Sequence, residues 1–155
     1  MSEPLCEFVT DYDAWTEIDD LEAVCERAIQ IAASRMTERR PGTAVILFTG
    51  DETVEVLNGQ YRARPRPTNV LSFPAPEREG YPGDIALAYQ TCVAEAGAAG
   101  IALRDRAAHL ALHGFLHLNG YTHDEDAAAE AMEALETAVL AELGIADPYL
   151  IPERQ

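Results

Sequence analysis

Continuous apolar runs and amphipathic stretches alternate along the first third of this chain. Residues 5–10 and 43–49 are apolar enough to form strands, and the second of these runs (TAVILFT) is typical of a buried strand. Between them, residues 17–36 carry apolar side chains at helical spacing, and Pro41 and Gly42 end that segment. A strand, a helix and a strand of these lengths predict a right-handed crossover that joins a parallel pair.

The middle of the chain predicts two more strands, separated by loops. Asp51 is placed to cap a short helix that continues to about residue 61. Residues 62–67 contain two prolines and form a loop, residues 70–73 form a short strand, and residues 74–83 form a loop rich in proline and glycine. Residues 84–89 alternate larger and smaller apolar side chains, which predicts a half-buried strand.

Three helices are predicted in the second half. Residues 91–99 form a short helix, and residues 104–118 are apolar enough to form a helix deep in the core. Residues 124–143 form an amphipathic helix whose acids lie away from its apolar face, and Gly144 ends it. The predicted fold class is α+β: one domain spanning residues 1–155, with a small mixed four-stranded sheet surrounded by about five helices.

Three of the four histidines lie in the run HGFLHLNGYTH, on the predicted central helix and just after it. His113 and His117 are one turn apart on the same helix face. Gly120 lets the chain leave the helix in a left-handed conformation, so that His123 can return to the same point. Three imidazoles with a position left for water indicate a catalytic zinc-type site. His109, one turn further back, is interpreted as structural or as support for the ligands.

The same spacing leaves a metallopeptidase as an alternative. It matches the metzincin pattern H-E-x-x-H-x-x-G-x-x-H at all three histidines and the glycine. Metzincins place their general-base glutamate directly after the first histidine, where this chain has Gly114. A peptidase would therefore need another carboxylate. Asp124 and Glu125 are near in sequence, but acids at such positions more often cap helices.

The charge of the chain limits its interaction with nucleic acids. The formal net charge is −16, and all eleven basic residues are arginines, so the surface as a whole repels polyanions. Residues 57–76 break the trend, because they contain Arg62, Arg64 and Arg66 and no acid. This segment is either an ordinary solvated loop or a set of guanidinium forks for phosphate. If it faces the metal, the two features together form a phosphodiester site.

Other global features favour a cytoplasmic protein. No apolar stretch reaches the roughly 18 residues of a membrane span. The first twenty residues contain no basic side chain, unlike a signal peptide. Cys6, Cys25 and Cys92 are scattered and odd in number, which predicts reduced core thiols in place of a disulfide framework.

The histidine run closely resembles the H-G-x-L-H-L-x-G-Y-D-H signature of the YbeY endoribonucleases, the bacterial ribosomal-RNA maturation factors. The resemblance extends to LN and YR within residues 57–62, PTNVLSFP at 67–74, GDI at 83–85, MEALE at 132–136 and DPY at 147–149. It covers about residues 44–150. Thr122 stands where the family usually has aspartate, and Asn69 stands where many members have aspartate. If the first of these aspartates orients a ligand or water, a threonine hydroxyl does so only in part.

The resemblance implies a single-strand-specific, metal-dependent RNase of 16S rRNA 3′-end maturation and ribosome quality control. It implies one Zn²⁺ per chain, held by His113, His117 and His123, with Arg62 and His113 as the catalytic residues. It also implies a bacterial cytoplasmic setting, with the 16S rRNA precursor and the small ribosomal subunit or its proteins as partners, and neither DNA nor a membrane. A ribosome assembly factor with a structural metal is a further alternative.

Overall fold

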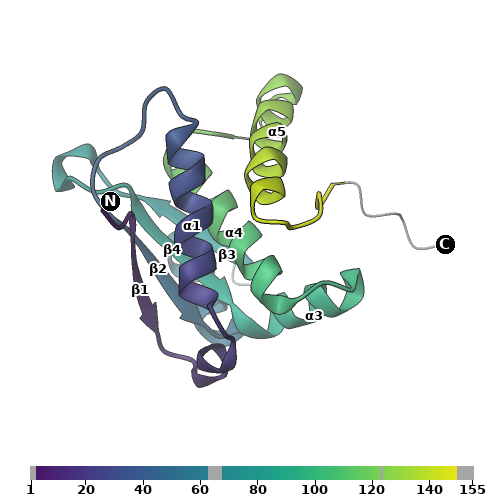
Figure 1. Ribbon diagram of the computed structural model, residues 1–155. Helices are drawn as coiled ribbons and strands as arrows, with labels where there is room; N and C mark the ends of the chain where they lie inside the picture. Colours follow the sequence, from purple (N-terminus) through teal and green to yellow (C-terminus); the bar gives the residue numbers. More distant parts are fainter. Residues whose placement is uncertain (1–2, 63–67, 123, 150–155) are drawn as a thin grey trace.

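The computed structural model describes residues 3–62, 68–122 and 124–149 (Figure 1). Within them, the strands form one mixed sheet in the order β1-β2-β4-β3. The strands are β1 (Cys6–Thr10), β2 (Ala44–Thr49), β3 (Val70–Pro74) and β4 (Gly83–Ala88). β1, β2 and β4 run parallel, and β3 pairs antiparallel with β4. The predicted mixed four-stranded sheet and the parallel pairing of the first two strands are confirmed.

Five α-helices surround the sheet in the described part of the chain. They are α1 (Leu21–Ser34), α2 (Asp51–Arg62), α3 (Tyr89–Ala99), α4 (Leu103–Leu118) and α5 (Asp126–Glu142). Two short 3₁₀ turns, η1 (Asp13–Glu17) and η2 (Glu77–Glu79), lie in the connections. The α+β prediction is therefore confirmed, with the histidine helix α4 at its centre.

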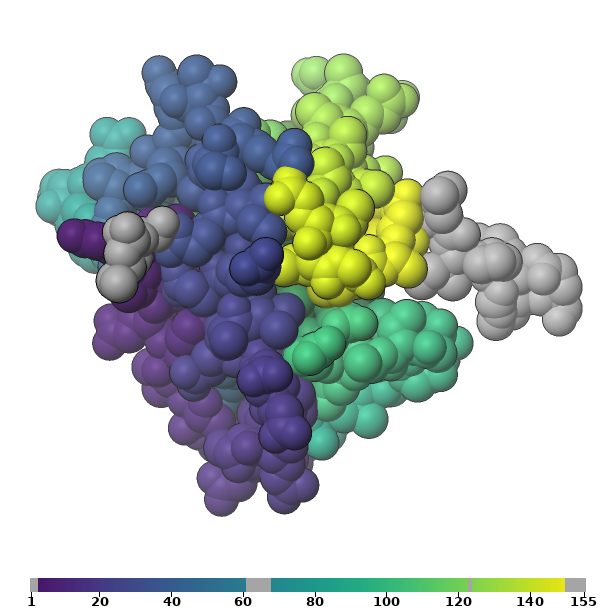
Figure 2. All heavy atoms as spheres, viewed as in Figure 1, coloured from purple at the N-terminus to yellow at the C-terminus, as the bar shows by residue number. Residues whose placement is uncertain are grey.

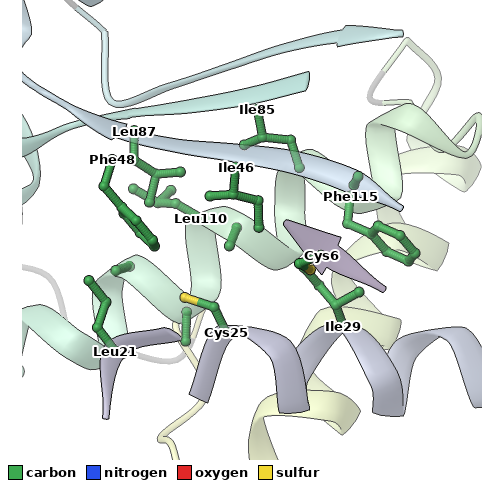
Figure 3. Packing of buried hydrophobic residues seen from close by; sticks show 14 of the residues in the cluster. Cys6, Leu21, Cys25, Ile29, Ile46, Phe48, Ile85, Leu87, Leu110 and Phe115 are labelled. Carbon is green, nitrogen blue, oxygen red and sulfur yellow. The ribbon is translucent and has the colours of Figure 1, made fainter. Parts of the chain in front are cut away.

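α1 and α4 cover one face of the sheet, and α5 packs on their outer side (Figure 1). The core between the sheet and these two helices is apolar, as Figure 3 shows. Its members include Ile46, Phe48, Ile85 and Leu87 from the strands, Cys25 and Ile29 from α1, and Leu110 and Phe115 from α4. The C-terminal end of α5 lies directly against α1 in Figure 2. Beneath the surface, Ala28 and Ala32 of α1 belong to one apolar cluster with Val139 and Leu140 of α5.

α2 covers part of the opposite face of the sheet. Its Val54 packs on Leu71, Ala86 and Ala88 of β3 and β4. β4 is therefore enclosed on both faces and on both edges, and every residue of it except Asp84 is buried. The prediction of a half-buried strand is wrong, because alternation between large and small apolar residues resembles alternation between buried and exposed ones.

The first helix begins later than its apolar spacing predicts. The predicted helix starts at residue 17, but Glu17 ends the 3₁₀ turn η1, which buries Trp15 so that its Nε1 atom donates to the Thr49 carbonyl at 2.8 Å. Asp20 then takes a left-handed conformation, with φ at 61°, and α1 starts at the next residue. Seating the indole against the end of β2 thus replaces the first turn of the predicted helix.

Asp51 caps a different helix from the one predicted. Its carboxylate oxygens accept from the backbone N–H of Thr91 at 2.9 Å and from the Thr91 hydroxyl at 2.8 Å, in the first turn of α3. The Gln90 side-chain oxygen in turn accepts from the backbone N–H of Asp51 at 2.8 Å. These reciprocal bonds satisfy first-turn N–H groups of both α2, which begins at Asp51, and α3, which begins at Tyr89 directly after β4.

The three cysteines agree with the expectation of core thiols from the sequence. Cys6, Cys25 and Cys92 are buried free thiols, as predicted. None of the helices in the described ranges is both long enough and apolar enough to cross a membrane.

Candidate metal centre

α4 brings His113 and His117 together on one face. Their ring centroids are 4.6 Å apart, the ring planes are nearly perpendicular at 85°, and their Nε2 atoms lie 3.1 Å from each other. Two nitrogen ligands of one tetrahedral zinc ion are about 3.3 Å apart. The pair therefore has a spacing that is compatible with a shared ion, and the assignment of both residues as metal ligands stays a prediction.

The other ring nitrogens fix the tautomers of both histidines. His113 Nδ1 lies 2.6 Å from Glu136 Oε2, and His117 Nδ1 lies 2.9 Å from the Tyr121 carbonyl oxygen. An ionised carboxylate and a carbonyl can only accept, so each Nδ1 carries the hydrogen and donates it. Both Nε2 atoms then direct lone pairs toward the same point. Two lone pairs at this separation repel unless a metal ion or a shared proton lies between them, so the donor set fits a metal ion.

The end of α4 places the acceptor for His117. Gly120 has φ at 98°, its N–H donates to the His117 carbonyl at 3.1 Å, and the Tyr121 N–H donates to the Leu116 carbonyl at 3.1 Å. These two bonds form a Schellman motif, which reverses the chain at a glycine. The predicted helix exit at Gly120 is confirmed. It also has an effect that the sequence did not reveal, because it turns the Tyr121 carbonyl back toward the His117 ring.

His123, the third predicted ligand, lies outside the described residues. Among the residues that are described, no group of three or more histidine, cysteine, aspartate or glutamate side chains is arranged to hold a metal. The assignment of His123 as a ligand remains a prediction. Thr122, at the departure from the family signature, accepts from the Asp124 N–H at 3.5 Å.

Glu136 of α5 is a buried carboxylate that contacts His113 of the pair. It has no exposed surface. It accepts from His113, from the Tyr149 hydroxyl and, at 3.4 Å, from His109 Nε2. Burial alone would raise the pKa of Glu136, but the hydrogen bonds from His109, His113 and Tyr149 lower it to about 2. The group therefore remains an ionised acceptor.

His109 faces this carboxylate, away from the two candidate ligands. Its Nδ1 atom lies 3.4 Å from Arg106 Nη1, which can only donate, so the hydrogen of the ring is on Nε2. That hydrogen is directed toward Glu136 Oε1. The structure thus places His109 where it supports a ligand, in keeping with its interpretation from the sequence.

Glu136 lies within the MEALE match but was assigned no role from the sequence, because the acids of the last helix were expected to lie away from its apolar face. In the structure Glu136 shares that face with Met132, Val139 and Leu140, all of which are fully buried. The signal was present, since these residues are four before, three after and four after Glu136. An acid at such a position indicates a buried polar group that requires partners.

Gly114 faces the sheet. A Cβ atom at this position would lie 2.9 Å from Cγ2 and 3.1 Å from Cγ1 of Ile85, a residue of β4. The position after His113 therefore has no room for the glutamate that metzincins carry there. This contact argues against a peptidase of that type.

The arginine-rich segment is described only in part. Arg62 is the last residue of α2, and the structure describes its backbone but not its side chain. Arg64 and Arg66 lie outside the described residues. Whether these arginines face the metal therefore remains a prediction.

Asn69, which follows the three arginines in this segment, is linked to α4 through Glu95. Asn69 Nδ2 donates to the carboxylate oxygens of Glu95 at 3.0 and 3.2 Å, and Arg106 of α4 binds the same carboxylate through Nη2 at 2.6 Å and through Nε at 3.0 Å. A polar chain thus runs from Asn69 through Glu95 to Arg106, which also contacts His109. It links the edge of the sheet at β3 to the helix that carries the histidines.

The described residues combine a mixed α+β sheet with a central helix that carries two paired histidines, and the family of this chain can be stated on that basis. The family model described as Endoribonuclease YbeY matches residues 9–144. The chain therefore belongs to the YbeY endoribonuclease family.

Individual relatives agree with this assignment. The chain is 45% identical to Endoribonuclease YbeY of Maricaulis maris, over 92% of this chain and 90% of the relative. It is 44% identical to Endoribonuclease YbeY of Rhodopseudomonas palustris strain BisB18, over 97% and 95%. It is 59% identical to that of Erythrobacter litoralis, over 67% and 72%. The solution structure of TM1509 from Thermotoga maritima has a similar fold, with a TM-score of 0.56 at 21% identity, covering 96% of this chain and 99% of that one.

Proposed function

We propose that this chain is a single-domain, metal-dependent endoribonuclease whose ion, Zn²⁺, is held by His113, His117 and His123. The observation that carries the proposal is the convergence of two Nε2 atoms, 3.1 Å apart, while the Nδ1 atom of each ring donates to an oxygen. A third imidazole from beyond the Gly120 turn leaves one position for water, which is the ligand pattern of catalytic zinc sites.

The bound ion would supply a Lewis acid for a phosphoryl oxygen and a lowered pKa for its water. The chain supplies position and charge. His113 is 20% exposed in its side chain, so a ligand on its Nε2 atom is within reach of a substrate, while Nδ1 is anchored below it. We assign His113 and Arg62 as the catalytic residues, His113 through the ion and Arg62 through the charge that develops on the phosphate.

Two features support RNA as the substrate. The first is membership of an endoribonuclease family. The second is the link from Asn69 through Glu95 to Arg106, which ties the end of the arginine segment to α4 although α2 and α4 lie on opposite faces of the sheet. We propose that the arginines of this segment contribute guanidinium groups to a phosphate bound at the histidines.

We further propose that the physiological substrate is the 16S rRNA precursor, cut as a single strand during 3′-end maturation and ribosome quality control in the bacterial cytoplasm. With a net charge of −16, the chain repels RNA at long range. Affinity for naked RNA is therefore weak, and the small ribosomal subunit or one of its proteins supplies the remaining binding energy.

The two alternatives predict different activities. A metallopeptidase would need a general base that the space beside Gly114 does not admit. An assembly factor with a structural metal would bind the ion but would not cut RNA.

One assay separates the three functions. Metal-loaded protein is given matched single-stranded RNA, duplex RNA and unfolded casein, with His113→Ala prepared in parallel as the control. Preferential cleavage of the single strand, abolished in His113→Ala, supports the proposal. Casein hydrolysis without RNA cleavage indicates the peptidase, and stoichiometric metal without either activity indicates the assembly factor.

A further inference from the structure

We infer that Glu136 is a positioning residue of the metal centre: a buried carboxylate on α5 that holds the His113 ring of α4 in the orientation and tautomer that direct Nε2 at the ion. The inference rests on the proposed metal site and extends it to a residue outside the histidine run. Glu136 touches neither the ion nor RNA, so its effect passes entirely through His113.

The contact between the two side chains determines both properties of the ring. An imidazole on a helix can rotate about its terminal torsion, and its hydrogen can sit on either nitrogen. A 2.6 Å bond from Nδ1 to Glu136 Oε2 fixes the rotation and the hydrogen together. Metal-bound histidines in proteins almost always donate their second nitrogen to such an acceptor, which also raises the basicity of the ligating nitrogen.

The carboxylate is itself held in place. Its Oε2 atom serves His113, while its Oε1 atom accepts from the Tyr149 hydroxyl and from His109 Nε2. The Arg106 guanidinium fixes the tautomer of His109 in turn. With partners on both oxygens, Glu136 cannot turn away from His113 without losing several hydrogen bonds.

The chain after α5 closes over this arrangement. Asp147 accepts from the Tyr149 backbone N–H at 2.8 Å and from the Thr137 hydroxyl at 3.2 Å. These bonds direct the Tyr149 ring toward Glu136, where it lies 5.8 Å from the His109 ring in an edge-to-face contact. The anchor is thus shielded from water, whereas the ring that it holds is partly exposed.

The cost of burying the Glu136 carboxylate indicates that its charge orients His113 and does not stabilise the fold. Glu136 lies among fully buried apolar residues of α5, on the face formed by Met132, Val139 and Leu140. Burying a carboxylate in such a place is strongly unfavourable before its hydrogen bonds form, and an apolar side chain of similar volume is often at least as stable. A group that only packed two helices together would not need a charge.

The test compares Glu136→Gln with Glu130→Gln, an exposed glutamate on the same helix, and with wild type. The affinity for Zn²⁺ alone is measured by competition with a chromophoric chelator, and circular dichroism reports on the fold. Removing a partner of a metal-bound histidine typically weakens metal binding 10–100-fold. We expect that loss for Glu136→Gln with the helical signal retained, and no change for Glu130→Gln.

A spectroscopic measurement on the metal-free protein addresses positioning directly. Long-range ¹⁵N–¹H correlation spectra at pH 8 distinguish the two histidine tautomers. Wild type and Glu130→Gln should show His113 with its hydrogen on Nδ1, whereas Glu136→Gln should show a mixture. A His113 ring with its hydrogen on Nε2 in the wild type would overturn the inference without any variant.

The outcomes separate this inference from the metal site on which it rests. If His113→Ala binds Zn²⁺ as tightly as the wild type, the site itself is wrong. If His113→Ala loses Zn²⁺ while Glu136→Gln binds it within twofold of wild type, only the positioning role is wrong. Should Glu136→Gln fail to fold, Glu136→Asp keeps the charge on a side chain that is one methylene shorter. Wild-type affinity in folded Glu136→Asp would equally overturn the inference.

Discussion

A Cβ atom on Gly114 would lie 2.9 Å from Cγ2 of Ile85, so α4 approaches β4 as closely as a glycine permits. An alanine at an ordinary helix position stabilises a protein by about 1 kcal/mol relative to glycine. At Gly114 the added methyl group must displace a fully buried side chain of the central strand, which costs about 1–3 kcal/mol.

Gly114→Ala should therefore fail to gain stability and should lower the urea midpoint of unfolding. The control is Gly97→Ala on α3, because a Cβ atom there meets nothing within 4 Å. We expect the control to be stabilised by up to about 1 kcal/mol. Equal stabilisation of both variants would show that α4 can move away from the sheet.

Metal content should depend on each proposed ligand. Purified wild type should hold one divalent ion per chain, and His113→Ala, His117→Ala and His123→Ala should hold much less. Because protons compete with the ion for imidazole nitrogens, the affinity should also fall as pH drops from neutral to mildly acidic values. Elemental analysis and chelator competition across pH measure both effects. Equal metal content in wild type and His117→Ala would rule the site out.

Arg62→Ala should lose RNA cleavage while keeping its metal and its melting temperature. Loss of one charge-assisted contact to a developing phosphate charge costs about 2–4 kcal/mol, or roughly 30- to 1000-fold in rate. Arg78→Ala is the matched control, since it removes the same charge from the exposed turn η2. Single-turnover cleavage rates give the comparison. A fall in melting temperature or metal content in Arg62→Ala would identify the residue as structural.

The buried thiols should make the protein less stable at alkaline pH. Burial raises the pKa of Cys25 and of Cys92 from 9.0 to about 12. The folded state therefore keeps protons that the unfolded chain releases above about pH 9, so the stabilisation is complete below pH 9 and declines as pH rises toward 12. The decline is at most about 1.4 kcal/mol per pH unit for each thiol.

Urea unfolding at pH 8 and pH 10 measures this effect, and Cys25→Ala should show a shallower decline than wild type. A thiol reagent at pH 8 should react with the folded protein only slowly, and with all three cysteines once urea is present. Rapid reaction of the folded protein would mean that the thiols are accessible.

Binding of single-stranded RNA should weaken only gradually with salt. If Arg62, Arg64 and Arg66 make the phosphate contacts, the slope of log K against log salt is about −2, from roughly −0.7 per phosphate. Arg62→Ala should make the slope less negative by about 0.7. Fluorescence anisotropy with a short labelled RNA measures it. A slope of about −5 would indicate a much larger basic surface.

The sequence predicted the parts of this molecule that depend on local spacing. His113 and His117 are one helical turn apart, and a glycine at position 120 has few uses other than reversing the chain. The strands at residues 6–10 and 44–49 followed from apolar runs. In each case the neighbours along the chain determine the structure.

The features that the sequence did not predict depend on distant partners. Helix α1 begins at Leu21, after the turn η1 in which Trp15 bonds to Thr49 of β2. Glu136 is buried because His113 and His109 of a different helix donate to it. Single-sequence periodicity does not identify either partner. Residues 17–20 were therefore predicted as helix, and Glu136 was predicted as a surface acid although its spacing from apolar residues places it on the buried face.

The position of β4 also has a consequence for synthesis. β4 is the last of the described strands along the chain but lies between β2 and β3, so a growing chain that ends before β4 leaves β2 with one unpaired edge. Open strand edges of this kind promote association between chains. β3 and β4 are close in sequence and antiparallel, so they can form a hairpin within microseconds of leaving the exit tunnel. Docking of that hairpin against β2 would then close the edge in a single step, which makes the nascent chain most prone to aggregation just before residue 88 emerges.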